Sequence, residues 1–197
     1  MMRKPSLLAV LFVWLAVSAC CVSPQPAVEY PPIDHLLIDE SPFPEGWVAT
    51  EPSWEHPPRA PWSGPTKMVE YINRGFYTHS GDGAAAGISI RQFDSSRAAA
   101  KEYEHRVDVA FRIRDEKMQT PWGTPEGLSF ESSEADQYRY GCSEVFGQAR
   151  CAYVAQYEVY VIDFHSSIYD TDVITYNDFL PVFQAIDGQM EQHLGER

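Results

Sequence analysis

The chain has 197 residues, of which 44% are hydrophobic and 22% are charged, and its formal net charge at pH 7 is −13. This length and apolar content suit one folded domain with a buried core. The excess of acidic side chains repels phosphate backbones and anionic lipid headgroups, which argues against nucleic acid as a partner.

The N-terminal residues have the pattern of an export signal. A short basic start is followed by an almost unbroken apolar run at 7–17 and by the small residues of Val17-Ser18-Ala19-Cys20. The apolar stretch 7–19 holds about 13 residues, or roughly 20 Å as a helix. A hydrocarbon core needs roughly 30 Å. The pattern therefore favours a cleaved signal over a permanent transmembrane helix.

The segment Val17-Ser18-Ala19-Cys20 resembles the lipobox of bacterial lipoproteins at each position. The resemblance implies a signal peptide at 1–19, a diacylglycerol thioether on Cys20 and cleavage before that residue. It implies a protein anchored to the cell membrane by lipid and facing away from the cytoplasm. Two or more acyl chains give stable anchoring. A plain secretory signal without lipidation is the alternative. Cys21 has no predicted role.

The region after the signal divides into a spacer and a domain. Residues 20–35 are expected to form a Pro-rich tether, because four prolines within 22–35 favour an extended, semi-rigid chain. Residues 36–197 are expected to form a single domain. Without Arg3 and Lys4, 13 basic residues remain against 28 acidic ones, a net charge of −15. The acidic domain should therefore stand off the bilayer.

Apolar and polar residues alternate in several short segments, and such alternation predicts strands. The expected strands are 47–49, 67–78, 88–93, 128–130, 137–142, 151–156 and 159–164. Proline and glycine predict an irregular loop at 52–65 and a turn at 81–87. Tyr157-Glu158 is a candidate hairpin turn between the last two strands.

Two segments have helical spacing of their apolar residues. The first helix is expected over 96–115, after the capping side chains of 94–97. The second is expected to follow Asp178 as its cap, with Pro181 in the first turn and Gly195 at the end. Hairpin-connected strands with two helices on one face predict an α+β fold, an antiparallel sheet and a two-layer sandwich.

Cys142 and Cys151 lie in flanking strand candidates around the segment 143–150. In an exported protein, such a pair is expected to form a disulfide. A redox or metal site is the alternative, but the spacing is not that of a CxxC motif and no histidine flanks the pair.

The layout from 88 to the C-terminus has four parts: a strand leading into a capped helix, a cysteine-paired hairpin, a Tyr- and Val-rich strand pair, and a closing amphipathic helix. This layout resembles the small α+β extracellular domains of bacterial lipoproteins and of some Ser/Thr kinase sensors. The resemblance implies a membrane-anchored binding or sensor module, and it carries over no functional residue.

Acidic residues and a histidine near the last strand form the one candidate cation site. Asp163 and His165 are two apart on a predicted strand, so their side chains share a face. With Asp172 they could bind a cation, with the carboxylates favouring hard ions and the histidine favouring zinc. The alternative is a polar strand end without a metal.

Four aromatic residues form a candidate ligand-binding surface, because aromatic rings give large contact area at low entropic cost. They are Trp54, Trp62, Tyr71 and Tyr77. In the alternative interpretation these rings seal the edge of a sheet.

Other catalytic patterns are missing from the sequence. The glycines of 81–87 precede a strand and lack the lysine of a phosphate-binding loop, and there is no Gly-x-Ser-x-Gly elbow. We therefore predict no catalytic residue and no cofactor. The favoured hypothesis is a membrane-anchored module that binds a small molecule or a protein. A small metal-assisted enzyme and a structural envelope component are the alternatives.

Overall fold

A computed structural model describes residues 33–55, 68–78, 84–113, 117, 119–169 and 175–196. The predicted signal 1–19, Cys20, Cys21, Trp62 and Asp172 lie outside the described residues, as does most of the predicted tether.

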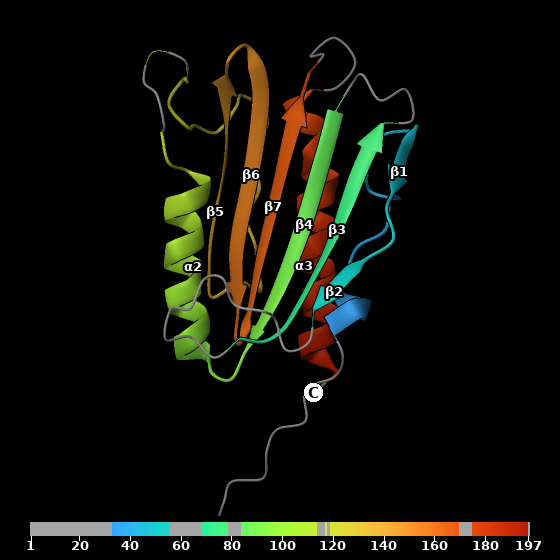
Figure 1. Ribbon diagram of the computed structural model, residues 1–197, viewed down its shortest axis with the longest axis vertical. Coiled ribbons are helices and arrows are strands. Elements are labelled where there is room, and N and C mark those ends of the chain that lie inside the picture. Colours follow the sequence, from blue (N-terminus) through green and yellow to red (C-terminus); the bar gives the residue numbers. More distant parts are fainter. Residues whose placement is uncertain are drawn as a thin grey trace, which may run out of the picture. The chain divides into compact units, whose positions relative to one another are not determined.

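The described residues form an open sheet of seven strands, all paired antiparallel (Figure 1). The strands are β1 (Trp47–Ala49), β2 (Ser53–Glu55), β3 (Met68–Thr78), β4 (Ala84–Phe93), β5 (Gln137–Val145), β6 (Gln148–Tyr157) and β7 (Tyr160–Ile168). Their order is β1-β3-β4-β7-β6-β5, and β2 also pairs with β3. The early strands β3 and β4 therefore lie directly beside β7.

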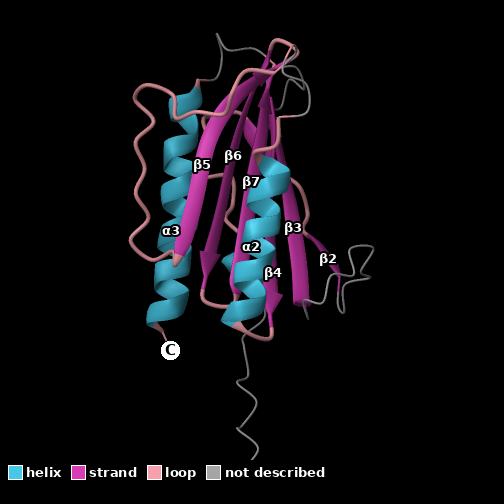
Figure 2. Ribbon diagram, turned by 90° about the vertical axis from the view of Figure 1, so that its left-hand side faces the viewer, coloured by secondary structure: helices cyan, strands magenta, loops and turns pink. Residues whose placement is uncertain are grey.

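Helices α2 (Ser96–Ala110) and α3 (Leu180–Gly195) pack on opposite faces of this sheet (Figure 2). On β6, Val154 belongs to the apolar cluster under α2, whereas the neighbouring Tyr153 stacks on Phe183 of α3 with ring centroids 5.1 Å apart. The predicted α+β fold with two helices on an antiparallel sheet is confirmed. The expected placement of both helices on one face is wrong, because the central strands are apolar on both sides and both sides need cover.

The core under α2 is small and includes residues from three strands and the helix. Ser95 caps α2, since its side chain accepts a hydrogen bond from the amide of Ala98 at 3.3 Å, as the capping pattern predicts. The helix ends at Ala110, earlier than the expected 115. Its buried cluster consists of Phe93, Ala99, Tyr103, Phe111, Ala152, Val154 and Val161.

The core under α3 is aromatic. Phe43 stacks on Phe76 with ring centroids 4.4 Å apart, and Phe164 contacts both Phe179 and Phe183. Two short 3-10 helices border this core, η1 (Ile33–Leu36) and η2 (Tyr176–Phe179). The last helix begins after η2, carries a proline in its first turn and ends at Gly195, close to the predicted positions.

Two predicted segments differ from the observed structure. Residues 128–130 are not a strand but an irregular segment, whose Phe130 packs edge-on against Phe183 with centroids 5.9 Å apart. Apolar alternation there reflects packing against α3 instead of strand pairing. The predicted loop 52–65 contains β2, which pairs with β3, and the predicted turn 81–87 includes the first residues of β4.

The predicted disulfide is present. Cys142 and Cys151 are direct partners in the β5–β6 register and are bonded to each other. Both are buried, with 6% and 1% of their surfaces exposed. The bond therefore links the two strands next to their hairpin turn.

Removal of this disulfide is expected to lower the free energy of unfolding by roughly 2–3 kcal/mol, because the open loop of about 10 residues gains conformational entropy in the unfolded chain. Urea unfolding of the Cys142→Ala/Cys151→Ala variant against the wild type measures the difference. A change below about 0.5 kcal/mol would show that the bond constrains nothing that the hairpin does not already fix.

Candidate functional site

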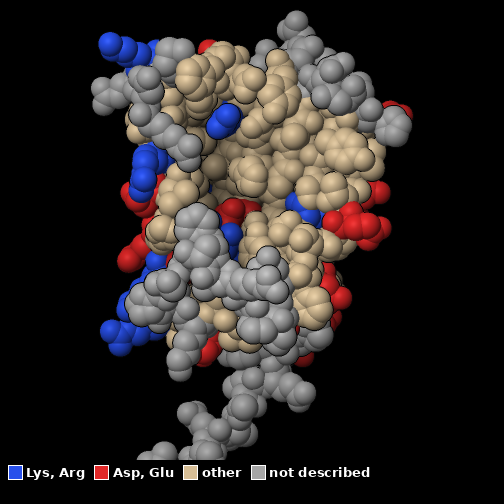
Figure 3. Space-filling view, in the orientation of Figure 1, with Lys and Arg blue, Asp and Glu red and all other residues tan. Residues whose placement is uncertain are grey.

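The α2 face of the sheet is only partly covered by described elements. Helix α2 packs over β6 and β7 and reaches β4, and β3 lies beyond α2 on this face (Figure 1). In the same orientation, the space-filling view shows a hollow in this face with acidic and basic atoms inside it (Figure 3). The strand residues that point to this side beyond α2 form the candidate site.

We call this surface the open platform. Its residues are aligned by the β3–β4–β7 register in three rows: Asn73, Ser89 and Asp163; Gly75, Gly87 and His165; and Tyr77, Ala85 and Ser167. Residues directly opposite on neighbouring strands point to the same face. The platform is therefore a small-residue floor that carries isolated polar groups.

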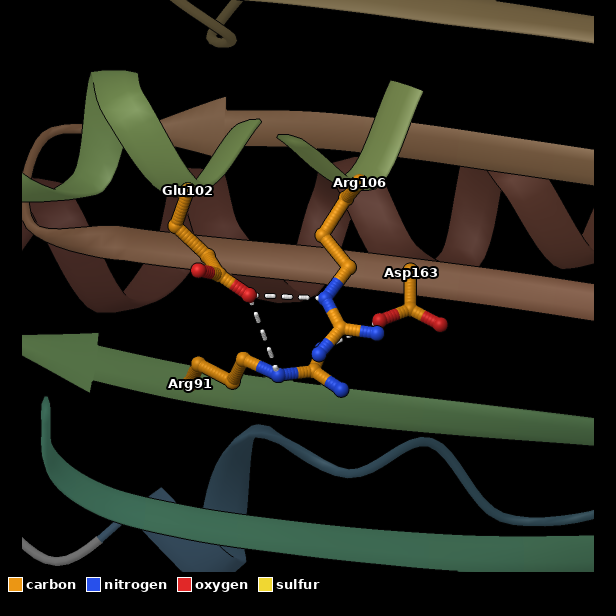
Figure 4. Close-up of polar contacts among 4 residues, drawn as sticks. All are labelled: Arg91, Glu102, Arg106 and Asp163. Carbon is orange, nitrogen blue, oxygen red and sulfur yellow. Dashed lines mark hydrogen bonds and ion pairs between the residues drawn. The ribbon is translucent and has the colours of Figure 1, made fainter. Parts of the chain in front are cut away.

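A network of four charged side chains lies at one end of the platform (Figure 4). Arg91 binds Asp163 through Nη1, and its Nε lies 3.8 Å from Glu102 on α2. Arg106 completes the network, with its Nε 2.7 Å from the same Glu102 oxygen. The side chains of Arg91 and Asp163 are only 7% and 16% exposed. Such enclosed charges are stable only while they are paired.

The face of Tyr71 covers the Arg91 guanidinium, whose carbon lies 5.1 Å from the ring centroid. Arg91 is thus held by a carboxylate on β7, a carboxylate on α2 and a ring on β3. Contacts from three elements fix the position of the guanidinium and join α2 to the uncovered side of the sheet.

His165 lies directly over Gly87 on the neighbouring strand. A Cβ atom at Gly87 would be 3.0 Å from Cε1 and 3.2 Å from Nε2 of the imidazole. Real Cβ atoms rarely have such close contacts, so the absence of a side chain at Gly87 gives the ring its place. His165 itself is exposed.

Several polar side chains of the platform are not used by the fold. Within the part of the chain that the structure describes, no hydrogen bond or ion pair involves the side chains of Asn73, Ser89, His165 or Ser167. Ser89 is 8% exposed, and its hydroxyl group makes no hydrogen bond to the described residues. These groups are therefore available to water or to a ligand.

The structure separates the predicted aromatic residues. Tyr71 and Tyr77 lie on the α2 face of β3, opposite Arg91 and Ala85 of β4. Trp54 is paired with Ile72 and therefore points to the other face, with 59% of its surface exposed. Trp62 lies outside the described residues. The two tyrosines are thus part of the open platform or its border, and Trp54 is not.

The predicted metal residues are placed as follows. Asp163 and His165 share the α2 face of β7, and the Asp163 carboxylate is bound to Arg91. Asp172 lies outside the described residues. Among the side chains that the structure describes, no group of three or more His, Cys, Asp or Glu is arranged to hold a metal ion. The three-residue metal site stays a prediction.

A second polar network lies under α3 and joins a loop to the helix. The Asp187 carboxylate accepts hydrogen bonds from the Ser132 hydroxyl, from the Ser133 amide at 3.2 Å and from the Tyr157 hydroxyl at 2.9 Å. Tyr153 lies 2.6 Å from Tyr157, oxygen to oxygen. Every group in this network has a partner within the protein, so its role is to fix the 128–136 segment.

This network predicts loss of stability in alkali. Burial raises the pKa of Tyr157 and Tyr153 above the ordinary value of 10.0, and the nearby Asp187 carboxylate adds to both shifts. Each folded tyrosine keeps its proton where the unfolded chain loses it. The stabilisation is complete below pH 10 and falls as the pH rises, by about 1.4 kcal/mol per pH unit for each tyrosine. Urea unfolding between pH 8 and pH 12 measures this slope.

Tyr157→Phe should reduce the loss of unfolding free energy per pH unit in alkali, since it removes one of the two buried tyrosine hydroxyls whose pKa is raised. The slope is the diagnostic quantity, because the substitution also removes a hydrogen bond to Asp187 at every pH. Equal slopes for the variant and the wild type would show that the Tyr157 hydroxyl does not contribute to the loss of stability in alkali.

A third polar contact joins η1 to the end of α3. The imidazoles of His35 and His193 lie 3.1 Å apart, nitrogen to nitrogen, and His193 Nε2 lies 3.1 Å from the Tyr160 hydroxyl. The contact fixes η1 against the last helix.

Sequence reasoning did not identify Asn73, Ser89, Arg91 or Glu102 as site residues. One signal was available: Arg91 and Asp163 are opposite charges within two otherwise apolar strand patterns. A pair of this kind suggests neighbouring strands, but the pairing of β4 with β7 is not visible in the sequence.

No family model and no curated protein matches the chain. Among solved structures, the chain is similar to the extracellular domain of PknH from Mycobacterium tuberculosis, with a TM-score of 0.48 and 8% sequence identity. The similarity covers 77% of this chain and 86% of that one. No helix in the described ranges is long and apolar enough to cross a bilayer.

Proposed function

We propose that this chain is a lipid-anchored, extracytoplasmic binding module and that the open platform is its binding surface. The lipobox-like segment 17–20 and the Pro-rich stretch after it support the anchor and tether. The Cys142–Cys151 disulfide supports an oxidising compartment, where such bonds persist.

One observation carries the assignment of the surface. The open platform combines unused hydrogen-bonding side chains with a floor that an enclosed ion network holds in place. Holding paired charges such as Arg91 and Asp163 away from water is a costly way to stabilise a fold. The same arrangement is useful where polar groups must be presented in fixed positions to a ligand.

The anchor is tested by Cys20→Ser, which should move the protein from the membrane fraction to the aqueous fraction. The variant lacks the sulfur that forms the thioether, and the acyl chains supply the membrane affinity. Cys21→Ser is the matched control and should stay with the membrane. Mass spectrometry of the native protein should find a diacylglycerol-modified N-terminal Cys20. An intact Met1 on cytosolic protein would contradict the proposed location.

The surface is tested by photo-crosslinking in intact cells. A photoreactive residue at Asn73 should give adducts with a bound molecule, since this position lies on the α2 face of β3 in one row with Ser89 and Asp163. The same residue at Gln184, which is exposed on α3, is the control and should give few adducts. Equal adduct yields from the two positions would show that the platform is no more than ordinary surface.

A further inference from the structure

We infer that the open platform binds a neutral carbohydrate. The inference rests on the proposed function and adds the chemical class of the ligand. It is argued from three properties of the platform: its charge balance, the hydrogen-bonding capacity of its unused side chains and its shape.

The charges of the enclosed network cancel, and the exposed Arg150 beside Ser167 is a separate cation at the edge of the platform. The enclosed network contains two cations, Arg91 and Arg106, and two anions, Glu102 and Asp163, all within one set of contacts. An anionic ligand would gain from Arg91 only by competing with the carboxylates that already bind it. A cationic ligand would face the same competition at Asp163. The network therefore favours neither an anionic nor a cationic ligand.

The unused side chains both donate and accept hydrogen bonds. The amide of Asn73 and the hydroxyls of Ser89 and Ser167 each have both capacities, and the His165 imidazole adds two ring nitrogens that can form hydrogen bonds. A carboxylate or a phosphodiester can only accept, and an ammonium group can only donate. Sugar hydroxyls do both, so a polyhydroxylated ligand can satisfy every group, and unsatisfied groups in a closed complex are costly.

The border of the platform offers an aromatic ring beside a small residue. Tyr77 is 44% exposed on the β3 side, opposite Ala85 of β4. The His165 imidazole lies over Gly87, Thr50 lies against Gly75, and the Tyr71 ring covers Arg91. Aromatic faces pack well against the apolar C–H face of a pyranose. Three strands and three rows span about 10 Å by 14 Å, which is room for one or two sugar rings.

The test uses the lipidated protein, purified in a detergent without a sugar headgroup. It is screened against immobilised neutral oligosaccharides of glucose, mannose, galactose, arabinose and N-acetylglucosamine. Oligosaccharides that carry uronic acid or sulfate groups are immobilised on the same surface as charged controls. Inorganic phosphate is added as a competitor. We expect saturable binding to at least one neutral oligosaccharide and no competition by phosphate.

Substitutions assign the binding to the platform. Asn73→Ala and His165→Ala should each weaken the neutral oligosaccharide about tenfold through lost hydrogen bonds. Arg150→Gln removes an exposed cation beside Ser167 and should change affinity less than about twofold, as should the distant Gln184→Ala. Unchanged melting temperatures show that the platform variants are folded.

Three outcomes would overturn the inference. They are binding to no neutral oligosaccharide, binding that survives both platform substitutions, and binding of acidic ligands alone with loss in Arg150→Gln. Crosslinking at Asn73 then separates the two proposals. A non-carbohydrate adduct there keeps the binding surface and rejects the ligand class, whereas no adduct rejects both.

Discussion

Replacing Arg91 by Met is expected to lower the free energy of unfolding by about 3–5 kcal/mol, the cost of leaving an enclosed charge without its partner. Asp163 would lose the guanidinium that binds it, and Glu102 would retain only Arg106. The methionine fills much of the volume of the arginine stem, so the loss reports charge pairing more than packing. Urea unfolding at neutral pH measures it.

A matched control is available on α2. Arg112 forms an i,i+4 ion pair with Asp108, and both side chains are more than half exposed, at 57% and 67%. Arg112→Met should therefore cost at most about 0.5 kcal/mol. Adding Asp163→Leu to Arg91→Met should recover part of the loss, because the unpaired carboxylate disappears. Equal effects of Arg91→Met and Arg112→Met would mean that the enclosed network does not hold the platform.

Replacing Asp187 by Ala is expected to cost about 3 kcal/mol, because donors left without an acceptor in the core each cost about 1–3 kcal/mol. Asp187 is 8% exposed and accepts from Ser132, Ser133 and Tyr157. The 128–136 segment would lose its attachment to α3. Urea unfolding measures the stability, and hydrogen exchange at the Ser133 amide measures the release of the segment.

Gln184→Ala, on an exposed position of the same helix, is the control and should change the stability by less than about 0.5 kcal/mol. If Asp187→Ala changed the free energy of unfolding as little as Gln184→Ala, the Asp187 carboxylate would not be the acceptor that fixes the 128–136 segment. Faster exchange at Ser133 without any loss of global stability would also contradict the expected magnitude.

Local patterns were sufficient to predict much of the fold. Helix α2 was predicted because Ser95 can cap it and its apolar residues recur at helical spacing, and both are local features. The β5–β6 hairpin and its disulfide were predictable because Cys142 and Cys151 flank a short turn. Each of these elements depends on residues close together in the chain.

The layers and the site depend on distant residues and could not be predicted in this way. Continuous apolar runs on β6 and β7 were consistent with cover on either face, so the sequence did not decide where α3 would pack. Adjacent positions such as Ser53 and Trp54 point to opposite faces, and only the pairing of β2 with β3 decides which face each takes. The platform needs the β3–β4–β7 register, which joins residues about 90 positions apart (Asn73 to Asp163).

Chemical-shift mapping tests most directly whether the open platform is a binding surface. Soluble envelope extract is titrated into the isotope-labelled protein while the backbone amide signals are followed. We predict that the largest shifts occur on β3, β4 and β7, at Asn73, Ser89 and His165 and their neighbours, and that the exposed side of α3 changes little. Saturating extract that leaves the platform signals unmoved, or shifts only α3, would contradict this prediction.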